Sequence, residues 1–106
     1  MADSPTFHTD LVSLLPPIPA DSIISRSVPA GPGVRATLFG FALGQELTEH
    51  TASRPAILHF LQGRARLTLG GEEKQARPGA WAYLPANLPH SIYAEEPVVM
   101  LLLLLD

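Results

Sequence analysis

Two histidines stand where an imidazole could do chemistry. His50 lies in the stretch GQELTEHTASRPAILHFLQG, residues 44–63, and His90 follows a turn sequence, ANLP. A neutral imidazole can bind a metal ion, or it can donate one hydrogen bond and accept another. Glu46 stands four residues before His50, so a regular strand would turn both side chains to one face. An imidazole and a carboxylate on one face can both bind a divalent transition metal, which is the candidate cofactor.

The other histidines and the nucleophilic residues give weaker signals. His8 belongs to an N-terminal arm, and His59, three residues after Ala56, should face away from the interior if Ala56 faces inward. The chain has no cysteine, which excludes disulfides and thiolate metal sites. No serine stands in a recognisable nucleophile elbow, so nucleophilic catalysis is not indicated.

The composition is that of one globular domain. The 106 residues are 46% hydrophobic and 16% charged, which suits a chain with a single core. A net charge of −3 and scattered basic residues argue against nucleic-acid binding. The apolar run at residues 98–105 is far shorter than the roughly 20 residues of a membrane span, and the first residues show no secretory signal. We expect a cytoplasmic protein with no membrane partner.

The elements that must position these histidines read as short strands. Residues 1–20 form an arm, because four prolines there forbid a long helix or a central strand; its segment 10–15 fits either a short helical turn or an edge strand. Residues 21–106 form the domain, with about nine strand candidates between glycine and proline turns. Gly70 and Gly71 predict a two-residue hairpin. The sequence therefore predicts an all-β sandwich or barrel.

Two glycine-to-histidine spacings resemble the two sequence motifs of the cupin family. Six of ten motif positions match in this register: Gly44, His50, Gly63, Gly79, Pro85 and His90. The resemblance covers roughly residues 23–105, and it implies a double-sheet jelly-roll barrel in which His50 and His90 face the interior. Gly63 and Gly79 should lie in turns.

The positions at which the chain departs from the cupin pattern include two metal ligands. The pattern places a second histidine and a glutamate where this chain has Ala52 and Ala56, and it places glycine and asparagine where the chain has Asn87 and Ala94. His50 and His90 alone are a poor set for a catalytic metal, which commonly takes three protein ligands. If Glu46 faces the same side, it would complete the set of two histidines and one carboxylate found in many non-haem iron sites. The alanines instead open an apolar interior with two polar groups, the usual make-up of a ligand pocket.

These observations favour a cupin-like protein that binds a small molecule in the barrel interior, at His50 and His90, without a tightly held metal. The alternative that the resemblance allows is a metal-dependent oxygenase, isomerase or decarboxylase. A purely structural domain is the third reading, if side chains fill the interior. Five aromatic residues could line the pocket but more often belong to a core: Phe39, Phe41, Phe60, Trp81 and Tyr83.

Residues 98–105 and 38–43 do not alternate apolar and polar side chains. Strands of this kind need cover on both sheet faces. We expect the arm to supply part of that cover and a second subunit the rest, so a homodimer is predicted.

Overall fold

The chain forms two antiparallel sheets with no long helix among the residues described. The structure is a computed structural model that describes residues 4–106. Its single helical element is a 3-10 turn at Val12–Leu14, designated η1. The nine strands of this part are β1 (Ile23–Val28), β2 (Val34–Phe41), β3 (Glu46–His50), β4 (Ala56–Gln62), β5 (Ala65–Leu69), β6 (Glu72–Ala76), β7 (Trp81–Leu84), β8 (His90–Ala94) and β9 (Val98–Leu105). The predicted all-β class is confirmed.

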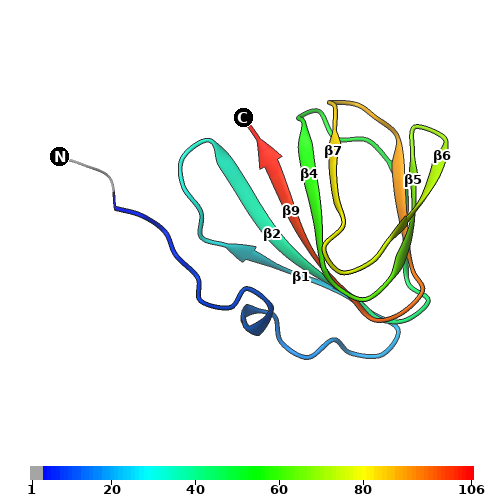
Figure 1. The fold of residues 1–106 in the computed structure, drawn as a ribbon, viewed down its shortest axis with the longest axis horizontal. Helices are drawn as coiled ribbons and strands as arrows, with labels where there is room; N and C mark the ends of the chain where they lie inside the picture. The colour runs from blue at the N-terminus through cyan, green and yellow to red at the C-terminus, as the bar shows by residue number, and fades with distance from the viewer. Residues whose placement is uncertain (1–3) are drawn as a thin grey trace.

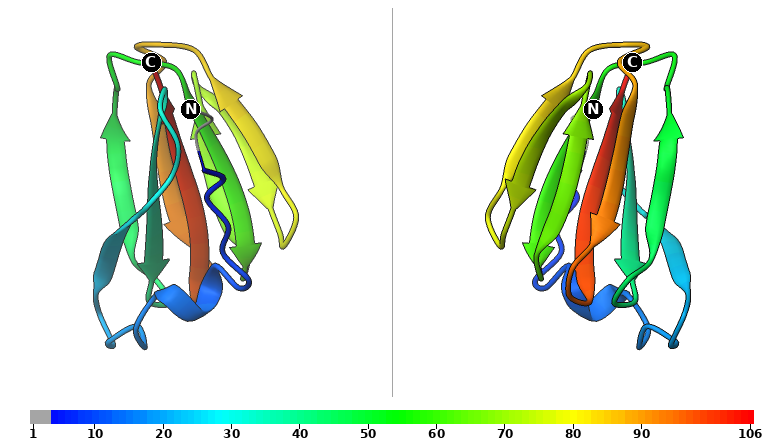
Figure 2. Two further views of the ribbon diagram at one scale, coloured as in Figure 1. Left: turned by 90° about the vertical axis from the view of Figure 1, so that its left-hand side faces the viewer. Right: turned by 90° about the vertical axis from the view of Figure 1, so that its right-hand side faces the viewer.

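The sheets have the strand orders β1-β2-β9-β4-β7 and β3-β8-β5-β6. Figures 1 and 2 show them as two layers, with β1 and β2 extending beyond the part where the layers face each other. Strands distant in the chain are neighbours in both sheets, as in a jelly roll. The sheets do not close into a complete barrel, so the fold is a barrel-like sandwich.

The main core lies between the two sheets. Strand β9 alternates across its sheet, with Val98 and Met100 in this inner core and Val99 and Leu101 in a second cluster on the outer face. Phe41 and Phe60, both fully buried, belong to the inner core. The unbroken apolar sequence of β9 therefore reflects burial on both faces.

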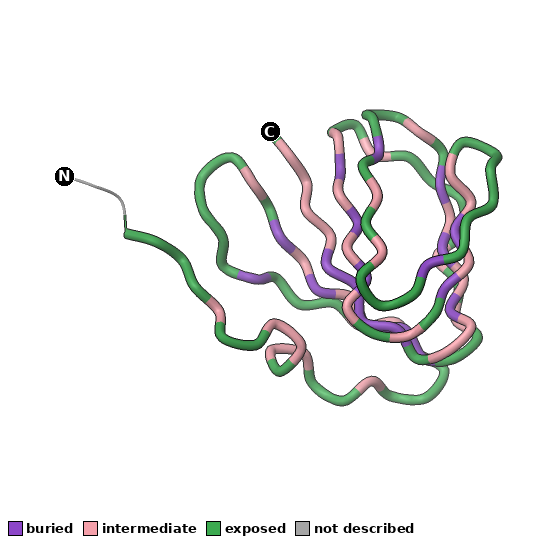
Figure 3. Tube along the Cα trace, in the orientation of Figure 1, coloured by how far each residue is buried: buried purple, intermediate pink, exposed green. Residues whose placement is uncertain are grey.

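The N-terminal arm covers part of the outer face of the five-stranded sheet. Leu15 and Ile18 of the arm pack against the second cluster, and a Cβ added at Gly40 on β2 would lie 2.7 Å from side-chain carbons of both. Of the two alternatives for residues 10–15, the structure has the helical turn, and the Asp10 carboxylate accepts a hydrogen bond from the Val12 amide at 3.2 Å. Figure 3 shows the mostly exposed arm running outside the buried strands.

Turn residues behave as their sequence predicts. Gly70 and Gly71 join β5 to β6 with φ of 57° and 87°, the two positive values of a type I′ hairpin. Gly63 and Gly79 lie in the connections β4–β5 and β6–β7, also with positive φ. Within residues 4–106, no helix has the length and apolar character to cross a bilayer.

Candidate functional site

An irregularity in β3 brings His50 opposite His90. Along the β3–β8 pairing Leu47 faces Ile92 and His50 faces His90, so three steps on β3 correspond to two on β8. This is the geometry of a β-bulge, which changes which face a side chain takes. Because Leu47 and Ile92 pack in the inner core, His90, two residues before Ile92, lies on the inner face. The bulge turns His50 to that face too.

The two imidazole rings are in contact. Their centroids lie 4.1 Å apart with an angle of 55° between the ring planes. His90 is buried, with 7% of its surface exposed, and His50 is exposed. The pair therefore stands at the rim of the interior, with one ring inside and the other at the surface.

Backbone carbonyls hold both rings through the same ring nitrogen, Nδ1. Nδ1 of His50 lies 2.9 Å from the carbonyl oxygen of Thr48, and Nδ1 of His90 lies 2.9 Å from that of Leu88. A carbonyl oxygen only accepts hydrogen bonds, so each Nδ1 carries the proton and donates it. In the neutral form each Nε2 is then an acceptor, free to bind a donor group or a metal ion.

Burial keeps the inner ring neutral. Desolvation lowers the pKa of His90 below its usual 6.5, the hydrogen bond to the Leu88 carbonyl opposes this shift, and the nearby His50 lowers the pKa further. Both lowering effects act against the charged form. At neutral pH His90 therefore presents an uncharged Nε2 to any ligand.

The third candidate ligand, Glu46, does not join the pair. Glu46 is exposed and faces Tyr93 across the β3–β8 pairing. Its neighbour Leu47 points into the core, so Glu46 points to the outer face. The expectation that Glu46 and His50 share a face assumed a regular strand, and the bulge removes that condition. Within residues 4–106 no three His, Cys, Asp or Glu side chains gather as a metal site.

The donor set therefore does not fit a tightly held metal ion. A catalytic zinc or iron site usually has three protein ligands, and among the residues that the structure describes only His50 and His90 are brought together. Ala56 is buried in the core. The carbonyl oxygen of Ala52 accepts a hydrogen bond from the backbone N–H of Asn87 at 2.7 Å. Asn87, which stands where the cupin pattern has a glycine, has a positive φ of 67°, a conformation that asparagine tolerates. This contact ties together the loop that follows His50 and the loop that precedes His90.

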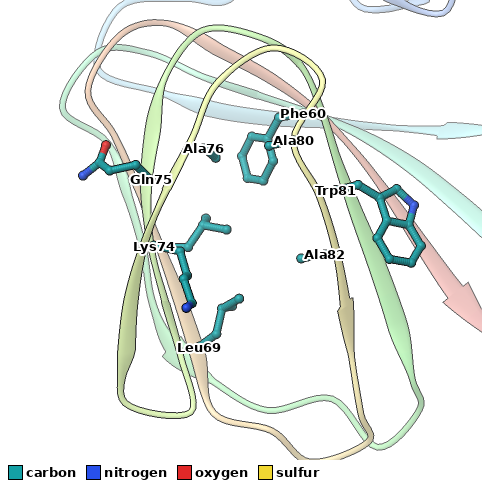
Figure 4. Close-up of a pocket in the computed structure, with 9 residues that line it drawn as sticks. Phe60, Leu69, Lys74, Gln75, Ala76, Ala80, Trp81 and Ala82 are labelled. Atoms are coloured by element: carbon teal, nitrogen blue, oxygen red, sulfur yellow. The ribbon is translucent and has the colours of Figure 1, made fainter.

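A cavity of about 250 Å³ opens between β6 and β7. Figure 4 shows Phe60, Leu69, Lys74 and Ala82 around it. Neither histidine lines this cavity, but Leu69, which does, pairs directly with His90 across β5–β8. The cavity therefore lies next to the imidazole pair, because Leu69 at its wall lies opposite His90 on the inner face. The sequence did not predict this cavity. Its lining residues lie on different strands, and the distance between these strands is set only by the tertiary structure.

The other candidate residues lie partly in the core and partly at the surface. Phe41 and Phe60 are core residues, and Phe39 is partly buried against that core. Trp81 and Tyr83, by contrast, are 61% and 50% exposed on β7. Tyr93 lies beneath the Arg66 guanidinium, 4.8 Å from the ring centroid. His59 is half-buried opposite Trp81, and His8 contacts the Pro29 carbonyl oxygen through Nε2 at 2.8 Å. Neither His8 nor His59 joins the pair.

Two facing antiparallel sheets with jelly-roll connections, and an imidazole pair on their inner rim, define a cupin-type protein. The sequence profile of the cupin domain matches residues 37–104. The chain belongs to the cupin family, which confirms the resemblance of its two motifs. A comparison with curated proteins finds no match.

Solved structures share the fold. A cupin superfamily protein from Desulfitobacterium hafniense is 25% identical, with a TM-score of 0.81 over 90% of this chain and 86% of its own. A cupin 2 conserved barrel domain protein from Leptotrichia buccalis is 31% identical, with a TM-score of 0.82 over 91% of this chain and 46% of its own. KdgF from Halomonas sp. is 28% identical, with a TM-score of 0.72 over 79% of each chain.

Proposed function

We propose that this cupin binds a small molecule in its barrel interior, with the imidazoles of His50 and His90 as the polar contacts. The observation that supports this most directly is the close approach of two rings that are anchored through the same nitrogen. Both Nδ1 atoms are occupied by backbone carbonyls, and the centroids are 4.1 Å apart. One ligand can therefore reach both Nε2 atoms. Two imidazole nitrogens that can accept hydrogen bonds suit a ligand that carries hydroxyl or amide N–H groups.

The surroundings of the pair suit a binding site. Around the histidines the inner face is apolar, with Leu47, Leu69 and Leu88 packed against the core. Ligand pockets commonly combine such apolar walls with a few placed polar groups that fix orientation. The alanines at positions 52 and 56 replace the polar side chains of the cupin pattern, so the interior favours binding over metal-assisted chemistry.

The experiment that tests this proposal is a ligand screen on matched variants. Small fragments bearing hydroxyl or amide groups are screened by NMR against the wild-type protein, His50→Ala and His90→Ala. We expect bound fragments to shift the imidazole signals of His50 and His90 and to bind more weakly to both variants. His59→Ala is the control, because His59 lies away from the pair. Equal fragment binding to wild type and to both site variants would overturn the proposal.

The second candidate function is a metal-dependent enzyme. The observation that favours it is the pair of free Nε2 atoms on rings fixed through Nδ1, the arrangement typical of metal-ligating histidines. Against it stands the lack of a third ligand within residues 4–106. Elemental analysis of protein purified without chelator or nickel resin separates the two. We expect well below one metal ion per chain, and stoichiometric iron, manganese, nickel or zinc would instead favour the enzyme.

We further propose that the protein acts as a homodimer. The arm covers only part of the outer face of the five-stranded sheet, and β7 presents the exposed Trp81 and Tyr83 beside the half-buried Ile57 and His59. Monomeric proteins seldom leave large continuous apolar patches in water. A second copy that packs on this face would bury them.

A further inference from the structure

We infer that the cavity between β6 and β7 takes the apolar body of a small carboxylic acid, whose carboxylate pairs with Lys74. This inference deepens the proposed function and rests on it for the idea that the interior holds a ligand. It adds the chemical class of that ligand and the place of its apolar part. Its own support comes from residues other than the two histidines.

The cavity walls are almost entirely apolar. Seven of the nine residues around it, all within the described part of the chain, are hydrophobic: Phe60, Leu67, Leu69, Ala76, Ala80, Trp81 and Ala82. Three of these residues are alanine, so short side chains on β6 and β7 and between them leave the space open. In Figure 4 the Trp81 indole points away from the cavity, while Phe60 and Ala82 point into it. An apolar body of matching size would find contacts on all these walls.

Lys74 is the single charged residue among those nine. It pairs with Leu67 across β5–β6, and Leu67 is a core residue, so the Lys74 stem starts on the inner face. Figure 4 shows it beside Leu69 at the cavity wall. A lysine can lay its methylene stem along apolar surface while its ammonium stays in water. An ammonium at the edge of an apolar cavity selects a ligand with an apolar body and an anionic end.

The partner that Lys74 has now is easily exchanged. Its Nζ lies 3.8 Å from Glu72 Oε2, and the Lys74 and Glu72 side chains are 57% and 77% exposed. Exposed ion pairs of this kind contribute little to stability. A ligand carboxylate can therefore replace Glu72 at the ammonium without unfolding any part of the strand.

The cavity volume sets the size of the ligand. An apolar cavity of about 150 Å³ in another protein holds benzene, so about 250 Å³ corresponds to roughly ten non-hydrogen atoms. Octanoate has that size and provides a defined probe. Octan-1-ol and octylamine have nearly the same body, but one is neutral and the other is cationic. The three probes separate the contribution of the apolar cavity from that of Lys74.

The test uses the full chain labelled with ¹⁵N and titrated with each probe. We expect octanoate to shift the amide signals of residues 74–76 and 80–82, and to bind more tightly than octan-1-ol, with octylamine weakest. Lys74→Met should weaken octanoate binding about fivefold, the scale of one exposed charge pair, and leave octan-1-ol binding unchanged. Glu72→Gln, which frees Lys74, should not weaken octanoate binding. Equal affinity for octanoate and octan-1-ol would overturn the acid class.

A second variant tests the cavity itself. Ala82→Phe should fill the space and abolish octanoate binding, with Ala80→Leu as the alternative if Ala82→Phe folds poorly. Octanoate shifts confined to β3 and β8 around His50 and His90 would overturn the position inferred for the apolar body and would leave the proposed function standing. If His50→Ala and His90→Ala leave fragment binding unchanged while octanoate still binds beside Lys74, the proposed function fails and this site remains.

Discussion

His90 is buried at the rim of the interior while His50, whose ring centroid lies 4.1 Å away, is exposed. The two rings share one anchoring pattern but differ in solvent access. This difference predicts two different effects on stability. The stability should depend on pH through His90, and truncation should be better tolerated at His50.

Protonation of His90 should destabilise the protein. Its pKa is lowered in the folded state, chiefly by desolvation, so between that pKa and the usual 6.5 the unfolded chain binds more protons than the folded one. The free energy of unfolding therefore rises with pH in this window, and the His90 contribution is lost as pH falls through the folded pKa. Urea unfolding between roughly pH 7.5 and pH 5.5 measures this slope. His90→Gln should flatten it, and an unchanged slope in that variant would contradict the role of His90.

Truncation of His50 should be well tolerated. Its ring is exposed, and among the residues described its side chain makes one hydrogen bond, to the Thr48 carbonyl, which water can satisfy. His50→Ala should change the free energy of unfolding by no more than about 1–2 kcal/mol. Denaturant titration measures this change, with His59→Ala as the matched control. A much larger loss would mean that His50 is a structural residue.

Gly63 should be the glycine least able to accept a side chain. It has a φ of 81°, and an added Cβ would collide with the Pro97 carbonyl oxygen. Gly63→Ala should cost about 2–4 kcal/mol, from left-handed backbone strain and steric overlap together. Gly44→Ala is the control, since Gly44 has a φ of 82° with no atom within 4 Å of its Cβ position. Thermal unfolding should show Gly63→Ala to be clearly the less stable of the two.

Close packing at Gly40 should hold the N-terminal arm against the five-stranded sheet. A side chain at Gly40 on β2 would overlap Leu15 and Ile18, so Gly40→Val should lift the arm and cost about 1–3 kcal/mol. Limited proteolysis should then cut within residues 10–20 faster than in the wild type. Gly31→Val, at a position with open space, is the control. Equal cleavage of both variants would show that the arm does not depend on this contact.

The proposed homodimer makes Leu103 a sensitive position. Leu103 packs with the outer cluster, whereas Leu104 packs against the inner core. Leu103→Glu should therefore dissociate the dimer or precipitate the protein, because it places a charge on the face that would be buried. Ser91→Glu, on the outer face of the other sheet, should leave the dimer intact. Sedimentation of the wild type as a monomer of 11.4 kDa at micromolar concentrations would contradict the proposal.

The sequence by itself determined the fold class and indicated His50 and His90 as the candidate site residues. Short apolar runs between glycine and proline turns specify strands, because side-chain alternation and turn conformation are local properties. The Gly70–Gly71 hairpin followed in the same way. The spacings of Gly44 with His50 and of Gly79 with His90 were enough to indicate the cupin family.

Only the tertiary structure decided which side chains meet. Glu46 and His50 are four residues apart and would share a face on a regular strand, but the bulge between Leu47 and His50 puts them on opposite faces. A bulge depends on pairing with β8, which begins 40 residues after the end of β3, and no local pattern in β3 encodes it. The cavity beside Lys74 likewise depends on how far β6 and β7, the edge strands of different sheets, stand apart. Contacts between strands distant in sequence are set by the packing of the whole core, so they appear only in the folded chain.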